Sequence, residues 1–373
     1  MLEYALHVKP CQSVLIRSTS GGFEPRFESA REFLKGFGDP VTPIIWSRTV
    51  RDYVFLDCES ENVFEIQANY GRGWRNLFSH LKFSLFILRR LQVIKPKLIY
   101  ACDMDTLLPS LIWALNKKVV IVFDQFDPLS IRTRNRFLSL IIGRLEIYLS
   151  KKSDIKITAN KLRIPDDFRD DWFELKNAFG FDLNLKEFHK KKPPFVLFYG
   201  GILSPDRGLL ACAAAVSQEP DWEFHLYGQG SISDLFVNGK FRNVFMHEPV
   251  VHEELMRIAK SADLFLAMYD PSRSNNQFTA SNKLFEAAQL GIPLLTSRYT
   301  QLGDVVEDHD LGWTVKHGDT KEISAILSKC KKMDRKEKLQ AQRNLQDFFT
   351  KEQIEKQKVL HKLTRVLSSK LEA

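Results

Sequence analysis

The sequence predicts an α/β protein with two doubly wound, Rossmann-like parallel-sheet domains. Its 373 residues exceed what one hydrophobic core usually supports. Short apolar runs alternate with amphipathic helical stretches through both halves, which is typical of βαβ units. A Gly-Gly pair follows the first predicted strand of each half, at Gly21–Gly22 and Gly200–Gly201, where backbone can approach a ligand closely.

The chain is basic, with a net charge of +8 and a pI of about 9.1. This charge favours a partner that carries phosphates, either a nucleotide, a nucleic acid or an anionic membrane surface. We expect no nucleic-acid partner, because no base-stacking motif or recognition helix stands out. Apolar residues make up 44% of the chain and charged residues 27%, as in ordinary globular proteins.

The cysteines are scattered without the paired spacing of a disulfide framework or a zinc site. We therefore expect no metal or other cofactor and a reducing compartment. The sequence shows neither a signal peptide nor an apolar run of about 20 residues. The predicted location is cytoplasmic, or peripheral on the cytosolic face of a membrane.

The N-terminal half, residues 1–190, predicts a sheet with helices between its strands. Acids follow two of the strands directly, at Asp103, Asp105 and Asp127. Strand ends are where open α/β sheets place ligands, so these acids are candidates to position or deprotonate a substrate hydroxyl. The alternative is that they cap strand ends. Strands are predicted over 13–17, 41–46, 63–67, 97–102, 119–123 and 153–158, and helices over 26–37, 72–92, 107–116 and 131–152.

The predicted helix over 72–92 combines a basic border with an apolar face made by Trp74, Leu77, Phe78, Leu81, Leu85 and Leu88. This pattern suits the surface of an anionic bilayer. The alternative is a helix that packs on the core, because Phe83, Phe86 and Leu91 extend its apolar surface around most of the circumference. The proposed membrane contacts are Trp74, Arg75, Lys82 and Arg89.

A charged, proline-closed segment over 186–194 predicts the domain boundary. We expect a second α/β domain over 193–345 and a C-terminal helix over 346–373 that returns to the first domain. Strands are predicted over 195–199, 222–227, 244–247, 263–268 and 292–295, and helices over 209–216 and 253–260, with a further helix that Gly291 ends.

The helix that Gly291 ends begins with small polar residues, followed by Lys283 and Glu286. Free N–H groups at a helix start, with a lysine beside them, make an anion site. A glutamate one turn along suits the two hydroxyls of a ribose. Arg207, at an earlier helix start, suits a diphosphate. The alternatives are a surface pair between Lys283 and Glu286, and one between Arg207 and Asp206.

Five segments of the second half occur in a characteristic order. They are Tyr199-Gly-Gly with Arg207-Gly208, Tyr227-Gly-Gln-Gly230, the run over 262–271, Ala280-Ser-Asn-Lys-Leu-Phe-Glu286 and Gly291-Ile-Pro-Leu-Leu295. Together they resemble the C-terminal half of the retaining GT-B glycosyltransferases of glycosyltransferase family four. The N-terminal half is more weakly similar, at 18–22, 103–105 and 124–127.

This resemblance implies a GT-B fold, with the two domains facing each other across a cleft and a nucleotide-sugar donor held mainly by the second domain. Glu286 matches the ribose-binding glutamate, Lys283 and Arg207 match diphosphate contacts, and Pro249–Val250 matches a base-pocket segment. Phe278 and Ile202 depart from the family pattern, which has glutamate and arginine there. The implied donor-binding residues are Gly21, Gly22, Gly201, Arg207, Gly228, Gly230, Pro249, Val250, Ser281, Asn282, Lys283, Leu284 and Glu286.

The implied activity is retaining transfer of a sugar from a nucleotide-diphosphate sugar to a glycan or lipid-linked acceptor, in bacterial surface polysaccharide synthesis. Lys283, Arg207 and helix N–H groups would stabilise the leaving diphosphate without a metal. The leaving phosphate would take the acceptor's proton. Two alternatives remain open at this stage, a nucleotide-sugar epimerase and a non-catalytic GT-B-like subunit.

Overall fold

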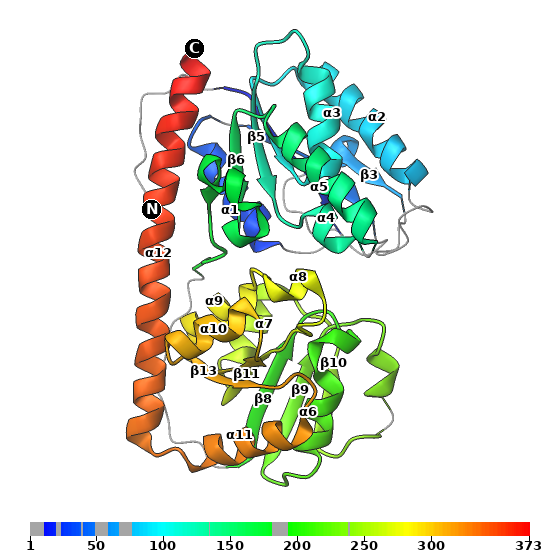
Figure 1. Ribbon diagram of the computed structural model, residues 1–373. Coiled ribbons are helices and arrows are strands. Elements are labelled where there is room, and N and C mark those ends of the chain that lie inside the picture. Colours follow the sequence, from blue (N-terminus) through cyan, green and yellow to red (C-terminus); the bar gives the residue numbers. More distant parts are fainter. Residues whose placement is uncertain are drawn as a thin grey trace. The chain divides into compact units, whose positions relative to one another are not determined.

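The computed structural model describes residues 11–19, 24–38, 40–48, 59–66, 77–133, 135–180, 193–237 and 239–373. The chain divides into two compact units (Figure 1). The N-terminal unit comprises residues 1–176 and 356–373, and the C-terminal unit comprises residues 177–355. The predicted boundary segment over 186–194 lies almost entirely outside the described residues.

The N-terminal unit is built on a seven-stranded parallel sheet with the strand order β3-β2-β1-β4-β5-β6-β7. This order reverses between β1 and β4, as in doubly wound folds, and places their carboxyl ends at a switch point. The strands are β1 (Ser13–Thr19), β2 (Val41–Ser47), β3 (Val63–Glu65), β4 (Leu98–Cys102), β5 (Val120–Gln125), β6 (Ile155–Thr158) and β7 (Phe173–Glu174).

Helices cover both faces of this sheet. On one face, α1 (Pro25–Lys35) packs with the last turns of α12 (Arg335–Glu372), where Leu363 and Leu367 are buried. The other face carries α2 (Leu77–Ile94), α3 (Met104–Ala114) and α5 (Arg136–Ser150), which follows the short helix α4 (Leu129–Arg132). The long helix predicted over 131–152 is therefore interrupted, and Asn135 caps its second part by accepting a hydrogen bond from Leu138 N.

The C-terminal unit has a six-stranded parallel sheet with the order β10-β9-β8-β11-β12-β13. Its strands are β8 (Phe195–Gly200), β9 (Trp222–Tyr227), β10 (Val244–His247), β11 (Leu264–Ala267), β12 (Leu294–Ser297) and β13 (Gly312–Val315). Its helices are α6 (Leu209–Val216), α7 (His252–Ala259), α8 (Ser274–Gln277), α9 (Asn282–Leu290), α10 (Gln301–Asp308), α11 (Thr320–Lys332) and the first part of α12. The prediction of two doubly wound parallel sheets is confirmed.

Two element boundaries bear on the site. Gly291 adopts φ +68° directly after α9, and this left-handed residue ends the helix as predicted. By contrast, α3 begins three residues earlier than the sequence predicted, so Asp105 lies in its first turn and not in a loop. Within the described ranges, no helix combines the length and the apolar character needed to cross a bilayer.

Candidate functional site

The loop after β8 lies against Lys283 in the C-terminal unit. Gly201 has φ +143°, and a Cβ there would lie 3.0 Å from Lys283 Nζ. The ammonium is 5.2 Å from the centre of the Tyr199 ring. Burial opposes its charge, but nearby Tyr269, Tyr199 and Glu286 outweigh that effect and raise the pKa of Lys283. The side chain is therefore a sheltered, permanently charged cation.

The start of α9 is fixed by Ser281. Its Oγ accepts a hydrogen bond from Lys283 N at 3.2 Å and lies 2.7 Å from Tyr269 Oη. Arg207 stacks on the Tyr269 ring, with Cζ 4.4 Å from the ring centre. Tyr269 thus connects the helix start that carries Lys283 with the loop that carries Arg207.

Arg207 is not paired with Asp206, the alternative that the sequence allowed. Asp206 instead accepts hydrogen bonds from Ser204 Oγ at 2.6 Å and Asn276 Nδ2 at 3.1 Å. Its pKa is lowered, because these hydrogen bonds and nearby cations outweigh the effect of its burial. Among the described residues, Nη1 of Arg207 is buried and has no hydrogen-bond partner. A buried guanidinium nitrogen in this state is suited to an incoming anion.

Glu286 pairs with His252, a residue that the sequence analysis did not single out. His252 Nε2 lies 3.0 Å from Glu286 Oε1. His252 is the first residue of α7, far from Glu286 in the sequence, so only the fold brings the two together. The predicted alternative, a surface pair between Lys283 and Glu286, does not occur, because both side chains are largely buried and Glu286 contacts His252.

Two glycines lie under the loop after β8 because no side chain fits there. A Cβ on Gly228 would lie 1.9 Å from Gly201 O, and one on Gly230 would lie 2.0 Å from Leu203 O. Next to them Tyr227 stacks on His247, with ring centres 4.3 Å apart. Pro249 and Val250 are exposed in the loop after β10.

The other residues that the sequence places at the donor site of this unit differ in how accessible their side chains are to a ligand. Asn282 is the first residue of α9, whereas the Leu284 side chain is buried in the core and leaves only its backbone for a ligand. Phe278 follows α8 and is half-buried, and Ile202 is exposed beside Gly201. Gly21 and Gly22 lie outside the described residues.

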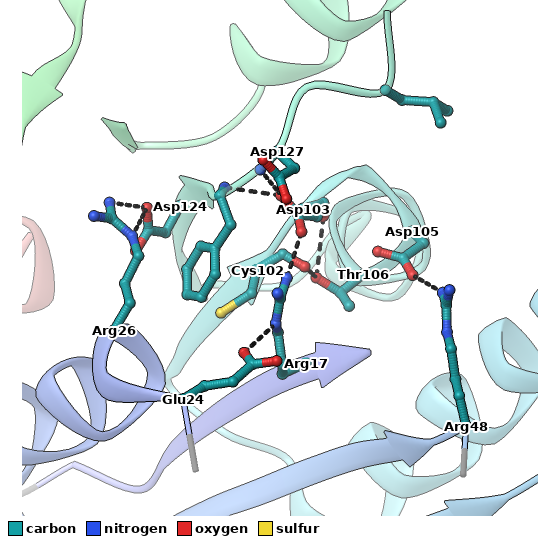
Figure 2. A network of polar contacts seen from close by, with 12 residues as sticks. Arg17, Glu24, Arg26, Arg48, Cys102, Asp103, Asp105, Thr106, Asp124 and Asp127 are labelled. Carbon is teal, nitrogen blue, oxygen red and sulfur yellow. Dashed lines mark hydrogen bonds and ion pairs between the residues drawn. The ribbon is translucent and has the colours of Figure 1, made fainter. Parts of the chain in front are cut away.

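In the N-terminal unit, Asp103 holds the ends of β4 and β5 together (Figure 2). Its Oδ1 accepts hydrogen bonds from Phe126 N at 2.8 Å and Asp127 N at 3.0 Å, and its Oδ2 pairs with Arg17. Asp103 itself adopts φ +66°, a conformation that ordinary residues rarely take. Because both carboxylate oxygens are occupied, Asp103 is a structural link and the weakest of the three acid candidates.

Asp105 faces a different environment. It is partly sheltered, with Arg48 Nη2 at 3.4 Å and His80 Nδ1 at 3.8 Å. Burial and the nearby Asp103 carboxylate raise the pKa of Asp105 to about 6, although Arg48 and Arg17 act in the opposite direction. A carboxylate with this pKa can exchange a proton near neutral pH.

The remaining sequence-predicted residues are exposed or undescribed. Asp127 is about half exposed and lies 3.3 Å from Arg163 Nη1. Lys82 and Arg89 are exposed on α2, and Trp74 and Arg75 lie outside the described residues. In the described part of the chain, no group of three or more histidine, cysteine or acidic side chains is arranged to hold a metal ion. The expectation of a metal-free site remains a prediction.

The two parallel sheets and the residues around Lys283 indicate the class of protein to which this chain is similar. The chain has the fold of the GT-B glycosyltransferases, and residues 193–331 match the family model described as glycosyl transferases group 1. That segment carries the Gly201 loop, Arg207, Lys283 and Glu286. The C-terminal unit therefore contains a glycosyltransferase domain, and the protein is a transferase.

Solved structures extend the similarity over nearly the whole chain. HepE (Alr3699) from Anabaena, in complex with UDP and glucose, is 16% identical with a TM-score of 0.68, covering 96% of this chain and 100% of that one. Sucrose-phosphate synthase from Thermosynechococcus elongatus is 14% identical with a TM-score of 0.66, covering 96% and 98%. A glycosyltransferase from Rickettsia africae is 13% identical with a TM-score of 0.60, covering 97% and 99%. A comparison with curated protein sequences gives no match.

Proposed function

We propose that this protein transfers a sugar, with retention of anomeric configuration, from a nucleoside-diphosphate sugar to a hydroxyl of a glycan or lipid-linked acceptor. The surface polysaccharides of bacteria are the proposed destination. The observation that carries the proposal is the pair of sheltered cations beside the start of α9. Lys283 and Arg207 contact the rings of Tyr199 and Tyr269, and the described residues supply no carboxylate that forms an ion pair with either.

A diphosphate suits this arrangement better than a single carboxylate. Two cations and the free N–H groups at the helix start present several donors to several oxygens. Glu286, oriented by His252, offers carboxylate oxygens to the ribose hydroxyls. Uridine is the first base to test, because the structure of Anabaena HepE contains UDP and one from E. coli contains UDP-2-fluoro glucose.

The chemistry follows from the charge that develops when the bond to the diphosphate breaks. Lys283 and Arg207 stabilise the departing phosphate oxygens. The acceptor oxygen bonds to the anomeric carbon on the face that the diphosphate leaves, and its proton passes to the departing phosphate oxygen. Asp105, with its pKa of about 6, is proposed to orient the acceptor hydroxyl.

The test begins with donor binding. Thermal unfolding is measured with UDP, GDP, ADP, CMP and dTDP, for the wild type, Lys283→Met and the control Lys332→Met, which alters an exposed lysine of α11. We expect one nucleotide to raise the Tm of the wild type and the control but not that of Lys283→Met. The donor site is wrong if Lys283→Met responds like the wild type.

Turnover then separates the activities. The sugar nucleotide of the selected base is incubated with and without glycan and lipid-linked acceptors, and the products are analysed. Transfer should depend on acceptor and give the anomeric configuration of the donor. Epimerised donor in the absence of acceptor would contradict the proposal, as would binding without any turnover across the acceptor panel.

A further inference from the structure

The helix α5 is oriented with its apolar stripe toward solvent. Phe137 is 73% exposed and Leu140 is 66% exposed, and Ile141 and Leu145 continue the stripe at helical spacing. The other side of α5 carries the buried Glu146 and Ser150, together with Ile147 and Leu149, which pack partly buried against the core. A surface helix normally shows the reverse arrangement, so this exposure needs an explanation.

Glu146 fixes the orientation. Its buried carboxylate accepts hydrogen bonds from Leu129 N at 2.7 Å and Ser130 N at 3.2 Å, and from Ser130 Oγ. These contacts satisfy N–H groups at the start of α4. Turning the apolar stripe of α5 inward would expose Glu146 and leave those groups unpaired. The exposed stripe is thus built into the packing of α4 and α5.

The neighbouring helices extend the same surface. On α2, Phe78, Leu81 and Leu85 are each more than half exposed, while Phe83, Ile87 and Leu91 hold the helix to the core. On α3, Leu108, Ile112 and Leu115 are exposed at helical spacing. α3 contacts both α2 and α5, and all three cover one face of the N-terminal sheet (Figure 1). Their exposed apolar residues therefore form one surface, which we call the three-helix face.

Within the helices of the three-helix face, the exposed charges are basic. The only acids within α2, α3 and α5 are Asp105, which contacts Arg48 and His80, and Glu146, which is buried. The exposed charges within these helices are Lys82, Arg89, Arg136 and Arg144, and the exposed lysines Lys117, Lys118, Lys151 and Lys152 follow α3 and α5. Two acids lie near these helices and are each paired, Glu61 with Arg90 of α2 and Asp154 with Lys370. Apolar side chains that project from helices, on a surface where exposed cations outnumber acids, complement an anionic lipid surface.

We infer that the three-helix face docks on an anionic lipid bilayer, with the apolar side chains of α2, α3 and α5 entering the headgroup boundary and the lysines and arginines contacting anionic headgroups. The inference does not require the proposed donor or the proposed chemistry. It does bear on the acceptor, because His80 on α2 and Asp105 on α3 lie at the ends of these same helices. A lipid-linked acceptor held in the bilayer would thus be presented beside Asp105.

The apolar contribution is tested by vesicle flotation, comparing phosphatidylglycerol–phosphatidylcholine vesicles with pure phosphatidylcholine. The double variant Leu81→Glu with Leu140→Glu should bind the anionic vesicles at least about tenfold more weakly than the wild type. The matched control, Val237→Glu with Ile354→Glu, changes exposed apolar residues of the C-terminal unit and should bind like the wild type. Equal binding by both double variants would overturn the inference.

The charge contribution is tested by Lys82→Glu with Lys152→Glu. This variant should also bind at least about tenfold more weakly, and added salt should weaken the wild type in the same direction. Its control is Lys332→Glu with Lys336→Glu in the C-terminal unit. Equal binding to anionic and neutral vesicles would contradict the charge argument. Circular dichroism and the nucleotide-induced Tm shift should be unchanged in all four variants, which keeps a failure here distinct from a failure of the donor site.

A second copy of the chain is the competing occupant of this face. Light scattering over a range of protein concentrations tests for it. Self-association that Leu81→Glu with Leu140→Glu abolishes, together with no vesicle binding by the wild type, would replace the bilayer with a dimer interface. A monomer that floats with anionic vesicles supports the inference.

Discussion

The two units treat their sheltered cations in opposite ways. In the N-terminal unit, Arg26 pairs with the fully buried Asp124, and Arg17 pairs with Glu24 and Asp103 (Figure 2). In the C-terminal unit, Lys283 and Arg207 lie against aromatic rings, and one Arg207 nitrogen is buried without a hydrogen bond in the described structure.

We take this difference to distinguish cations that stabilise the fold from cations that are proposed to bind a ligand. A buried charge with a hydrogen-bonded counter-charge is satisfied within the fold, so removing it should damage stability. A buried charge without one has its electrostatic potential available to a ligand, so removing it should damage binding and turnover. Composition alone could not distinguish the two groups.

The largest expected effect is the loss of stability when a buried ion pair of the N-terminal unit is broken. Arg26→Met leaves Asp124 buried beside Tyr100 without its cation, and this should lower the free energy of unfolding by about 3–5 kcal/mol. Urea denaturation measures the change. The double variant Arg26→Met with Asp124→Leu should recover much of the loss. A stability close to that of the wild type in the single variant would remove the distinction between the two cation groups.

Lys283→Met is the corresponding variant of a sheltered cation that has no ion pair in the described structure. It should reduce kcat by about 100–1,000-fold, because a charged donor to the leaving diphosphate is lost. Its denaturant midpoint should stay near that of the wild type. Steady-state assays of nucleoside diphosphate release measure the effect, with Lys332→Met as the control. Wild-type turnover in Lys283→Met would assign that lysine to the structural group.

Asp105 and Asp103 allow the same comparison between a functional and a structural charge within the N-terminal unit. Asp105 has a pKa of about 6, so lowering the pH below 6 protonates it and should reduce kcat/KM by about tenfold per pH unit. Asp105→Asn should remove this acid limb and lower activity at pH 7. Asp103→Asn should instead reduce stability, since it weakens the link between β4 and β5. A pH profile of Asp105→Asn that keeps the limb would exclude Asp105 as the titrating group.

The smallest expected effect concerns His252. His252→Ala removes the contact that orients Glu286, and the donor KM should rise by about tenfold with a smaller change in kcat. Arg257→Ala, on the exposed side of the same helix, is the control. If both variants keep the wild-type KM, Glu286 does not depend on His252 for its position.

The sequence predicts the local structure around Lys283 better than the arrangement of the N-terminal acids, and the reason is sequence distance. Ser281, Lys283, Glu286 and Gly291 lie within one capped helix, so local rules of capping and chain reversal are sufficient to find them. His252 and Tyr269 come from other elements, and only the fold brings them to this helix. In the N-terminal unit, Arg17, Asp103 and Arg163 meet only through the strand order, which a single sequence does not reveal.

The helix α2 shows why periodicity alone misassigns a face. The apolar face predicted from Phe78, Leu81 and Leu85 is exposed, whereas a second set at the same spacing, Phe83, Ile87 and Leu91, is buried. When a helix is apolar around most of its circumference, the pattern does not say which side meets the sheet. The core-packing alternative is confirmed for one side of α2, and contact of its exposed side with a membrane remains a prediction.

The helix α12 has a consequence for biosynthesis. Its first part belongs to the C-terminal unit, while residues 356–373 belong to the N-terminal unit, where Leu363 and Leu367 complete the core. A ribosome makes residues 1–176 before residues 177–355, but the leucines that complete the cover of one face of their sheet are translated only after both. The N-terminal half must therefore wait, incompletely covered, throughout synthesis of the other unit. In this chain the N-terminal half is translated first but cannot complete its core until α12 has been made. The nascent N-terminal half is therefore the species that exposes most apolar surface to a chaperone.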